Sequence, residues 1–324
     1  MKSYWIVTQG QEAVLELRDV PQPAPKAGEV LIRVRASGLN RGELIVGGAV
    51  HGGPEKLGGN EAAGEIEALG PGVTGWKVGD RVMGRVRGAW AAYAVTDVRQ
   101  VMPMPARLSF EQAAAIPSSF LTSYEAVVMH GKLAAGEWLL VAGASSGVGV
   151  GAIQTAKVLG ARTIGTSGSA AKLEKLKSIG LDVGICTRAP DFAQQVMAVT
   201  GGKGANLAVN LVGGTVFPEL LRSLAYQGRV AIVGYVDGQL SAEIDLNATH
   251  VNRFQIFGIS NAKLPPEQRA LLPQGFQRDI LPALVEGRIT PHVDRVFGFD
   301  ELPAAKAYME SNAMVGKIIV RMAT

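Results

Sequence analysis

The feature that most constrains the fold is a glycine-rich run in the middle of the chain, VAGASSGVGVGA at residues 141–152. A glycine inside a helix or strand costs roughly 1 kcal/mol relative to alanine, so this density of glycine needs a physical reason. Where a strand turns into a helix, glycines allow a tight turn, and the N–H groups at the helix start attract a pyrophosphate. The run therefore predicts a nucleotide-binding turn, with the phosphates against Ser146, Gly147, Val148 and Gly149.

The segments on both sides of the run support this interpretation. Apolar strands alternate with helices across short loops: strands are predicted at 138–143, 161–167, 183–187, 205–213 and 228–235, and helices at 148–159, 170–180, 192–200 and 217–224. Continuously apolar strands that alternate with helices are typical of a parallel sheet covered on both faces. A tight turn that binds no ligand is the alternative for the glycine run, and the strand before it and the helix after it favour the nucleotide.

The two ends of the chain follow a different pattern. Up to about residue 121, short alternating runs such as GEVLIRVRASGLN are broken by Gly and Pro, which predicts a partly closed β-barrel. From about residue 262, a helical stretch leads to the strand HVDRVFGF, the helix ELPAAKAYMES and the strand GKIIVRM, which we expect to rejoin the first domain. The predicted domains are 1–122 with 262–324, and 123–261.

Composition excludes several classes of protein. Charged residues make up 19% of the 324 residues and apolar residues 47%, and the net charge is +4 with a pI near 9.2. The cations are interleaved with acidic and apolar residues, so we expect small anionic ligands and do not expect nucleic acid as a partner. The single cysteine, Cys186, excludes an intramolecular disulfide, and no segment reads as a signal peptide or a membrane span. A cytoplasmic protein is predicted.

The end of the second predicted strand indicates which dinucleotide binds. An NAD site places an acidic residue there, but GTSGSAAKLEK has no acid before Glu174. Ser167, Ser169, Lys172 and Arg188 can instead donate hydrogen bonds to a 2′-phosphate, which predicts NADPH. The alternative is that Lys172 lies on a solvated helix face, as most helical lysines do.

Several segments together resemble one family. The succession of VRASGLN, GNEAAGEIEALGPGVTGWKVGDRV, AAAIPSSFLTSYEAV, GASSGVG, GTSGSAAKLE and GKIIV is similar to the medium-chain dehydrogenase/reductase superfamily over essentially the whole chain. The similarity is greatest to its zinc-independent quinone oxidoreductases, the zeta-crystallin-like group. The resemblance implies an α/β protein with a Rossmann doubly wound parallel sheet inserted into a GroES-like β-barrel catalytic domain.

The resemblance also implies a site without metal. Zinc-dependent members carry a cysteine and a histidine where this chain has Asn40 and Asn60, and only the following Glu61 is kept. Their four-cysteine lobe is missing as well. The four histidines at 51, 130, 250 and 292 have no ligand spacing, so no tetrahedral zinc site is expected.

Individual residues carry over from the group. Asn40 corresponds to an asparagine near the nicotinamide, Thr122 to a threonine near the carboxamide, Lys172 to a lysine for the 2′-phosphate, and Gly234 to a glycine facing the nicotinamide ring. A turn-forming asparagine in GLNRG is the alternative for Asn40.

The substrate pocket departs from the group, which often has tyrosines where this chain has Ile45 and His51. His51 is the titratable group near neutral pH in the glycine-rich segment GGAVHGGPEKLGG, which we expect to form a lid. We therefore hypothesise that His51 hydrogen-bonds the substrate carbonyl and helps to protonate the enolate, with water as the competing donor. An exposed loop histidine is the alternative.

These points predict an NADPH-dependent, metal-free reductase of quinones or α,β-unsaturated carbonyls. Hydride addition to a ketone forms a strongly basic alkoxide that needs a Lewis acid or a proton relay, whereas an enone or quinone gives a less basic anion. One alternative is an enoyl-thioester reductase acting on acyl-CoA. Another is a non-catalytic nucleotide- or RNA-binding protein like the structural zeta-crystallins, whose RNA binding would weaken steeply with salt.

The segment VNRFQIFGIS could form an edge strand that pairs across a two-fold axis, so a homodimer is also expected.

Overall fold

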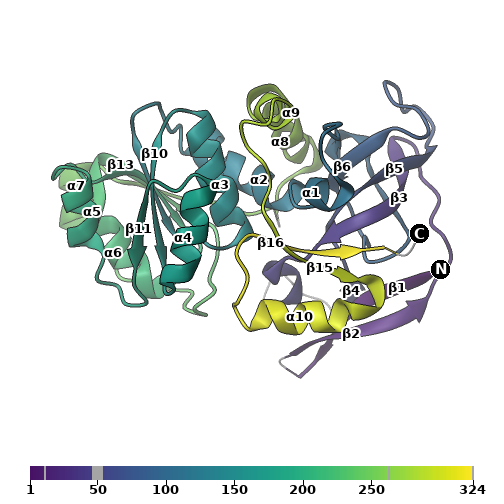
Figure 1. The fold of residues 1–324 in the computed structure, drawn as a ribbon, viewed down its shortest axis with the longest axis horizontal. Helices are drawn as coiled ribbons and strands as arrows, with labels where there is room; N and C mark the ends of the chain where they lie inside the picture. The colour runs from purple at the N-terminus through teal and green to yellow at the C-terminus, as the bar shows by residue number, and fades with distance from the viewer. Residues whose placement is uncertain (11, 46–53, 262, 323–324) are drawn as a thin grey trace. The chain divides into compact units, whose positions relative to one another are not determined.

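The computed structural model describes residues 1–10, 12–45, 54–261 and 263–322. The chain divides into two compact units (Figure 1). The terminal unit comprises Met1–Ser118 and Leu264–Thr324, and the inserted unit comprises Ser119–Lys263. The chain therefore leaves the terminal unit once and returns to complete it.

The inserted unit is built on a six-stranded sheet in the order β11-β10-β9-β12-β13-β14. All neighbouring strands are parallel. This is the strand order 3-2-1-4-5-6 of the Rossmann fold, which reverses direction between the first and fourth strands. The prediction of a doubly wound parallel sheet is confirmed. The strands are β9 (Trp138–Ala142), β10 (Arg162–Ser167), β11 (Val183–Cys186), β12 (Ala205–Asn210), β13 (Leu224–Ile232) and β14 (Gln255–Gly258).

Helices cover both faces of this sheet (Figure 1). Right-handed crossovers that run in opposite directions from β9 place their helices on opposite faces, which is why every central strand reads as a continuous apolar run. On one side, Phe192, Val196, Phe217 and Leu220 pack with Leu140, Ala142, Ile164 and Val230 in one buried cluster. The helices are α3 (Gly147–Val158), α4 (Ala170–Ile179), α5 (Ala193–Val199), α6 (Phe217–Arg222) and α7 (Leu246–Asn252).

Before β9, the chain passes from the terminal to the inserted unit through α2 (Pro117–Tyr124), which continues as a π-helical turn at Glu125–His130. None of the helices in the described ranges is both long and apolar enough to cross a membrane.

The terminal unit holds two sheets. A small one has the order β2-β1-β4, and a larger one runs β15-β16-β3-β5-β6-β8, with β7 also pairing β3. Its strands are β1 (Lys2–Gln9), β2 (Glu12–Asp19), β3 (Glu29–Gly38), β4 (Glu55–Leu57), β5 (Glu61–Leu69), β6 (Arg81–Arg85), β7 (Tyr93–Asp97), β8 (Val101–Pro103), β15 (Val293–Gly298) and β16 (Lys317–Arg321). Its helices are α1 (Phe110–Ala114), α8 (Pro266–Asp279), α9 (Leu281–Val285) and α10 (Leu302–Glu310).

Strand β3 is the axis of the larger sheet. It pairs with β5 along most of its length, while β7 pairs with its first half and β16 with its end, at Ala36–Gly38. Alternate apolar residues of β3 are fully buried in the core around Trp90, as the period-2 pattern predicts. The last strand of the chain therefore lies against the end of β3, directly before Asn40.

Candidate functional site

The predicted nucleotide-binding turn follows β9 and opens α3. Ser146 is the N-cap of α3, and its Oγ accepts a hydrogen bond of 3.0 Å from the backbone N–H of Gly149. The first N–H groups of a helix have no partner within the helix, so those of Gly147 and Val148 remain directed out of its N-terminus. This arrangement suits a phosphate, because the helix dipole and the N–H groups both favour negative charge.

The glycines of the turn are also required by packing within the chain. Gly143 adopts a left-handed conformation with φ +82°. A Cβ on Gly149 would lie 2.5 Å from the carbonyl oxygen of Ala144, and one on Gly151 would lie 2.6 Å from the hydroxyl of Ser123. The strand, the turn and the helix can therefore come this close only with glycine at these positions.

Helix α2 packs against the start of α3. The Ser123 hydroxyl lies 2.7 Å from the carbonyl oxygen of Ser119 and 2.9 Å from that of Val148 in the glycine-rich turn. Thr122 is the neighbouring residue of α2 and is half-buried. The structure thus brings the helix that carries Thr122 to the turn that carries Gly147 and Gly149.

A second group of polar residues gathers where β10 and β11 end. Ser169 caps α4 by accepting from the N–H of Lys172 at 3.4 Å, and the Ser167 hydroxyl accepts from the N–H of Ser169 at 3.3 Å. The Arg188 side chain lies over Gly168, since a Cβ on that glycine would be 2.5 Å from Arg188 Cγ and 2.7 Å from Nε. The exposed Arg188 side chain therefore lies beside the loop that joins Ser167 to Lys172.

Gly234 lies at the carboxyl end of the sheet as well. Its N–H donates a hydrogen bond of 3.2 Å to the carbonyl oxygen of Asn210, the last residue of β12. The Asn210 side chain in turn binds Gly213, with Nδ2 2.9 Å from the carbonyl oxygen and Oδ1 3.0 Å from the N–H. These hydrogen bonds join the loops that follow β12 and β13. In open parallel sheets, ligands bind at the carboxyl ends of the strands where the strand order reverses, and these two loops lie on the other side of that reversal from β10.

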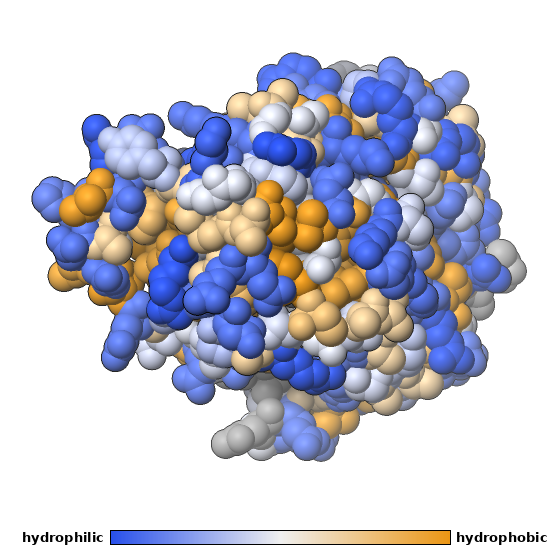
Figure 2. Space-filling model, turned by 60° about the vertical axis from the view of Figure 1, so that its left-hand side comes forward, coloured by the Kyte–Doolittle hydropathy of each residue, from blue (hydrophilic) through white to orange (hydrophobic). Residues whose placement is uncertain are grey.

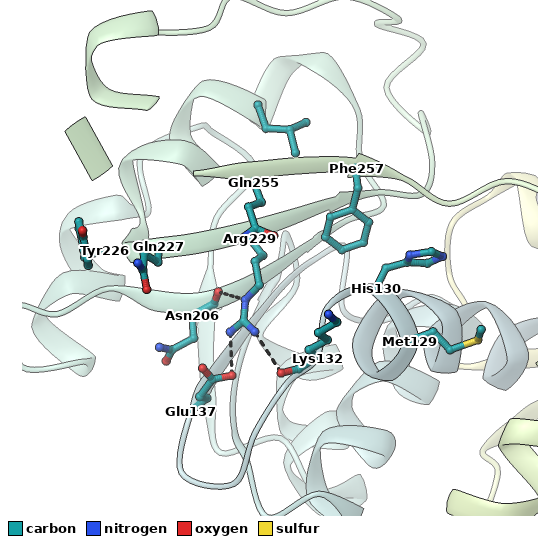
Figure 3. A pocket seen from close by; sticks show the side chains of 11 residues that line it. Met129, His130, Lys132, Glu137, Asn206, Tyr226, Gln227, Arg229, Gln255 and Phe257 are labelled. Carbon is teal, nitrogen blue, oxygen red and sulfur yellow. Dashed lines mark hydrogen bonds and ion pairs between the residues drawn. The ribbon is translucent and has the colours of Figure 1, made fainter. Parts of the chain in front are cut away.

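One pocket of the inserted unit lies at the opposite end of the strands (Figure 3). It has a volume of about 620 Å³, and its residues come from the amino-terminal parts of the strands: Glu137 precedes β9, Asn206 is in β12, and Arg229 pairs with Gln255 at the start of β14. Arg229 donates four hydrogen bonds within the chain, to Glu137 and to the carbonyls of Gly131, Lys132 and Asn206. Since nucleotides bind at the carboxyl ends of parallel strands, we do not assign the cofactor to this pocket.

In the terminal unit, Asn40 lies in a cluster of polar side chains. Its Nδ2 is 2.7 Å from Glu61 Oε1, 2.8 Å from Asn60 Oδ1 and 2.9 Å from Glu43 Oε1, and its Oδ1 accepts from Lys317 Nζ at 2.8 Å. Asn40 begins the short 3₁₀ helix Arg41–Leu44, but its side chain makes no capping bond there. The side-chain amide of Asn40 bonds to this cluster and not to the backbone of the turn. This argues against the alternative that Asn40 only forms the turn.

Glu61 and Ser118 complete the cluster. The Glu61 carboxylate is fully buried and accepts from Lys317 Nζ at 2.5 Å and from the N–H of Ser118 at 2.7 Å. The Ser118 hydroxyl lies 3.1 Å from Asn60 Oδ1. Asn40 and Asn60, which stand where zinc-dependent enzymes have a cysteine and a histidine, are therefore joined to each other by a hydrogen bond.

Glu43 has an unusual carboxyl group. It is buried, and this burial is the main cause that raises its pKa from the ordinary 4.5 to about 7, with the negative charge of Glu61 adding to the effect. Hydrogen bonds from Asn40 and from the N–H of Gly59, together with the charge of Lys317, oppose the rise. Glu43 therefore titrates near neutral pH inside the terminal unit.

His51 lies outside the described residues, so the structure does not place it. In the part of the chain that the structure describes, no three His, Cys, Asp or Glu side chains come together in a group that could hold a metal ion.

Sequence reasoning missed Lys317 and Glu43. Lys317 is 4% exposed in the last strand, and the signal available was a lysine that directly precedes the apolar run IIV. Glu43 is three residues after Asn40, but the spacing of a carboxylate in a short turn does not reveal its burial. Only the pairing of β16 with β3 brings Lys317 to Asn40.

The raised pKa of Glu43 has a consequence for stability. The folded state holds this proton more tightly than the unfolded chain, so the free energy of unfolding falls as pH rises from about 4.5 through about 7. Glu43→Gln does not titrate, so its stability relative to wild type should increase across this window by on the order of 3 kcal/mol. Urea unfolding at several pH values measures this difference, with Glu174→Gln, at a side chain 69% exposed, as the control. Parallel curves for Glu43→Gln and wild type would contradict it.

Comparison with known families agrees with the two units. The alcohol dehydrogenase GroES-like domain matches residues 26–106, and the zinc-binding dehydrogenase domain matches residues 147–274. Among solved structures, a mycobacterial protein complexed with NADPH superimposes with a TM-score of 0.87 at 26% identity, covering 99% of this chain and 100% of that one. The CurK enoyl reductase has a TM-score of 0.83 at 27% identity, with 99% and 100% covered.

Curated relatives include polyketide synthases and quinone oxidoreductases. The spectinabilin polyketide synthase system protein NorB of Streptomyces orinoci is 33% identical over 308 residues, which are 93% of this chain and 14% of NorB. The chain thus spans only a small part of the length of the polyketide synthases it matches. The human quinone oxidoreductase is 30% identical over 266 residues, 80% of each chain. The chain therefore belongs to the medium-chain dehydrogenase/reductase superfamily, in its zeta-crystallin-like quinone oxidoreductase group.

Proposed function

We propose that the protein is an NADPH-dependent oxidoreductase that reduces quinones or α,β-unsaturated carbonyls without a metal ion. The observation that carries the proposal is the phosphate turn at the strand-order reversal, together with Arg188 held over Gly168 beside Ser167 and Lys172. Oxidoreductase relatives, among them the human quinone oxidoreductase, support the class of reaction.

The residues present fit NADPH. The N-terminus of α3 at Gly147 and Val148 would hold the pyrophosphate, and the hydroxyl of Ser167 with the cations of Lys172 and Arg188 would hold the 2′-phosphate. No acidic residue lies in the loop from Ser167 to Lys172 that would repel this group. Bound there, NADPH supplies a hydride to the substrate.

The terminal unit supplies the polar groups for the substrate. The amide of Asn40 donates to Glu43, Asn60 and Glu61, and the Ser118 hydroxyl donates to Asn60, so a substrate oxygen that gains negative charge would replace one of these acceptors. An enolate or quinol anion is less basic than an alkoxide, so hydrogen bonds can stabilise it where a ketone reductase uses a Lewis acid. The amide donors at the two former ligand positions favour such metal-free chemistry, because amide nitrogens are not zinc ligands.

An enoyl-thioester reductase is the second candidate. The similarity to the CurK enoyl reductase and to polyketide synthases favours it. The same hydride addition to a carbon–carbon double bond next to a carbonyl would serve both substrate classes, so the two candidates differ in the group attached to that carbonyl.

Cofactor choice depends on the two cations at the end of β10 and β11. Lys172→Ala and Arg188→Ala should each weaken NADPH binding by roughly 1.5 to 3 kcal/mol and leave NADH binding nearly unchanged, because each removes a charge-assisted contact to the 2′-phosphate. Gly168→Ala should cause part of the same loss, since its Cβ would displace the Arg188 side chain. Fluorescence titration of both cofactors measures this, with the exposed Lys175→Ala as the matched control. Equal losses for the two cofactors, or a native preference for NADH, would refute the assignment.

The reaction itself is tested by the loss of NADPH absorbance with a panel of quinones, enals, enones and enoyl-CoA thioesters. We expect turnover of a quinone or an enone, and an unchanged rate after dialysis against a chelator. Faster turnover of enoyl-CoA would favour the second candidate, and activity that is lost on chelation and restored by zinc would overturn the metal-free chemistry.

The same assay tests the proposed role of His51: unchanged turnover and an unchanged pH profile in His51→Ala would eliminate this histidine as a proton donor.

A homodimer is proposed from the edge of the inserted sheet. Within the described ranges, β14 pairs only with β13, so its outer N–H and C=O groups can pair with a second copy. Apolar residues of the inserted unit are also exposed, including Tyr226, Leu246, Val251 and Ile256, and apolar side chains reach the surface in several places in Figure 2.

Light scattering after gel filtration should therefore give the mass of a dimer for the wild type, and that of a monomer for Ile256→Lys. Leu57→Lys, at an exposed apolar residue of the terminal unit, serves as the control and should stay dimeric. A monomeric wild type would contradict the proposal, as would an Ile256→Lys variant that keeps the dimer mass.

A further inference from the structure

The last strand of the chain places a lysine inside the polar cluster of the terminal unit. Lys317 is 4% exposed, and its Nζ lies 2.5 Å from Glu61 Oε1, 2.8 Å from Asn40 Oδ1 and 2.8 Å from the carbonyl oxygen of Leu39. An ammonium group has three N–H donors, so these three acceptors use all of them. Burying an ion pair costs several kcal/mol in desolvation, and apolar residues of similar volume often do as well for stability. The pair therefore calls for a reason beyond stability.

The ammonium determines which way the carboxamide of Asn40 points. Because Lys317 can only donate, the group that faces it must be the oxygen Oδ1, and the NH₂ group must face the other way. There it meets oxygens of Glu43, Asn60 and Glu61, all of which accept. In the reversed orientation, the NH₂ group would face the ammonium and the amide oxygen would face two carboxyl groups. The lysine thus selects one of two orientations that have almost the same shape.

The surroundings leave the pair little room to move. A Cβ on Gly38 would lie 2.3 Å from Glu61 Oε1 and 2.9 Å from Lys317 Cε, so both side chains pass directly over the backbone of β3. Ser118 holds the other carboxylate oxygen of Glu61 at 2.7 Å. Lys317 and Glu61 are therefore fixed against the strand end from which Asn40 continues.

The charges of the cluster are also balanced by this lysine. Glu43, Glu61 and Lys317 lie in it, and the charges of Glu61 and Lys317 act on Glu43 in opposite directions. With a proton on Glu43, one ammonium faces one carboxylate. Without Lys317, Glu43 and Glu61 would still face the NH₂ group of Asn40, but its amide oxygen would lose the donor that fixes it.

We propose that Lys317 is a positioning residue of the reductase, which, together with Glu61, holds the Asn40 carboxamide in the single orientation that the substrate reaction uses. The inference rests on the function proposed above, in which Asn40 contributes to the reacting site. It deepens that function by assigning a role to a side chain 277 residues away from Asn40 in the sequence.

The test is a double-mutant cycle of Lys317→Met and Asn40→Ala on the full chain. Lys317→Met should lower kcat by about tenfold to a hundredfold, as displacement of a reacting group does, with an unchanged Kd for NADPH. If Lys317 acts through Asn40, the double variant should be no slower than Asn40→Ala alone. Lys306→Met removes an ion-paired lysine of α10 from the same unit and should keep the wild-type kcat. The proposal would be overturned if the fold-losses of kcat in the two single variants multiplied in the double variant. A wild-type kcat in Lys317→Met would overturn it as well.

Two further measurements are needed. One distinguishes a lost orientation of Asn40 from a loss of stability, and the other tests that orientation without relying on the proposed reaction. Lys317→Met/Glu61→Gln removes both charges together, so it should recover the melting temperature that Lys317→Met loses while kcat stays low. Recovery of kcat together with the melting temperature would show a purely structural role and overturn the proposal.

The side-chain amide resonances of Asn40, identified by their loss in Asn40→Ala, can be measured without substrate. They should shift and broaden in Lys317→Met. Unchanged resonances would overturn the proposal even if the enzyme proved to reduce another class of substrate.

Discussion

The pairing of the last strand with the end of β3 is the contact on which the terminal unit depends. Strand β16 aligns Ile319 with Gly38 and Arg321 with Ala36, and so joins β15 to strands that come from the first third of the chain. This pairing allows an entire second unit to be inserted between residues 118 and 264 without interrupting the first core. It also delivers a buried ammonium group to Asn40, at a point where zinc-dependent relatives bind a metal ion.

The cluster around Asn40 shows how a polar group can be kept inside a protein. Every buried charge in it has a partner: Glu61 accepts from Lys317, Asn40 and Ser118, and Glu43 accepts from Asn40 and Gly59. Such networks are rigid because each member is satisfied only when all the others are in place. The raised pKa of Glu43 is the remaining cost of this burial, since one more negative charge cannot be fully compensated there.

The glycine-rich turn combines two requirements that a sequence does not separate. A phosphate needs free N–H groups and close access to the backbone, whereas α3 needs to pack tightly on Ala144 and on Ser123 of α2. Gly149 and Gly151 would be needed for the second purpose even without a ligand. The proposal that the turn is a nucleotide site is therefore supported by its place, at the reversal of strand order and next to the cations at the ends of β10 and β11.

Local patterns in the sequence were enough to predict the fold class. Continuous apolar strands that alternate with helices predicted the parallel sheet, because period and hydrophobicity are local properties, and the missing acid before Glu174 directed attention to Ser167, Lys172 and Arg188. Tertiary structure alone decided that Lys317 meets Asn40 and that Glu43 is buried. A lysine in a strand shows no sign in the sequence of which neighbour it will face, because strand pairing joins residues that are hundreds of positions apart. The same holds for the pKa of Glu43, which depends on how much water the folded chain excludes from its carboxyl group and not on the residues beside it in the sequence.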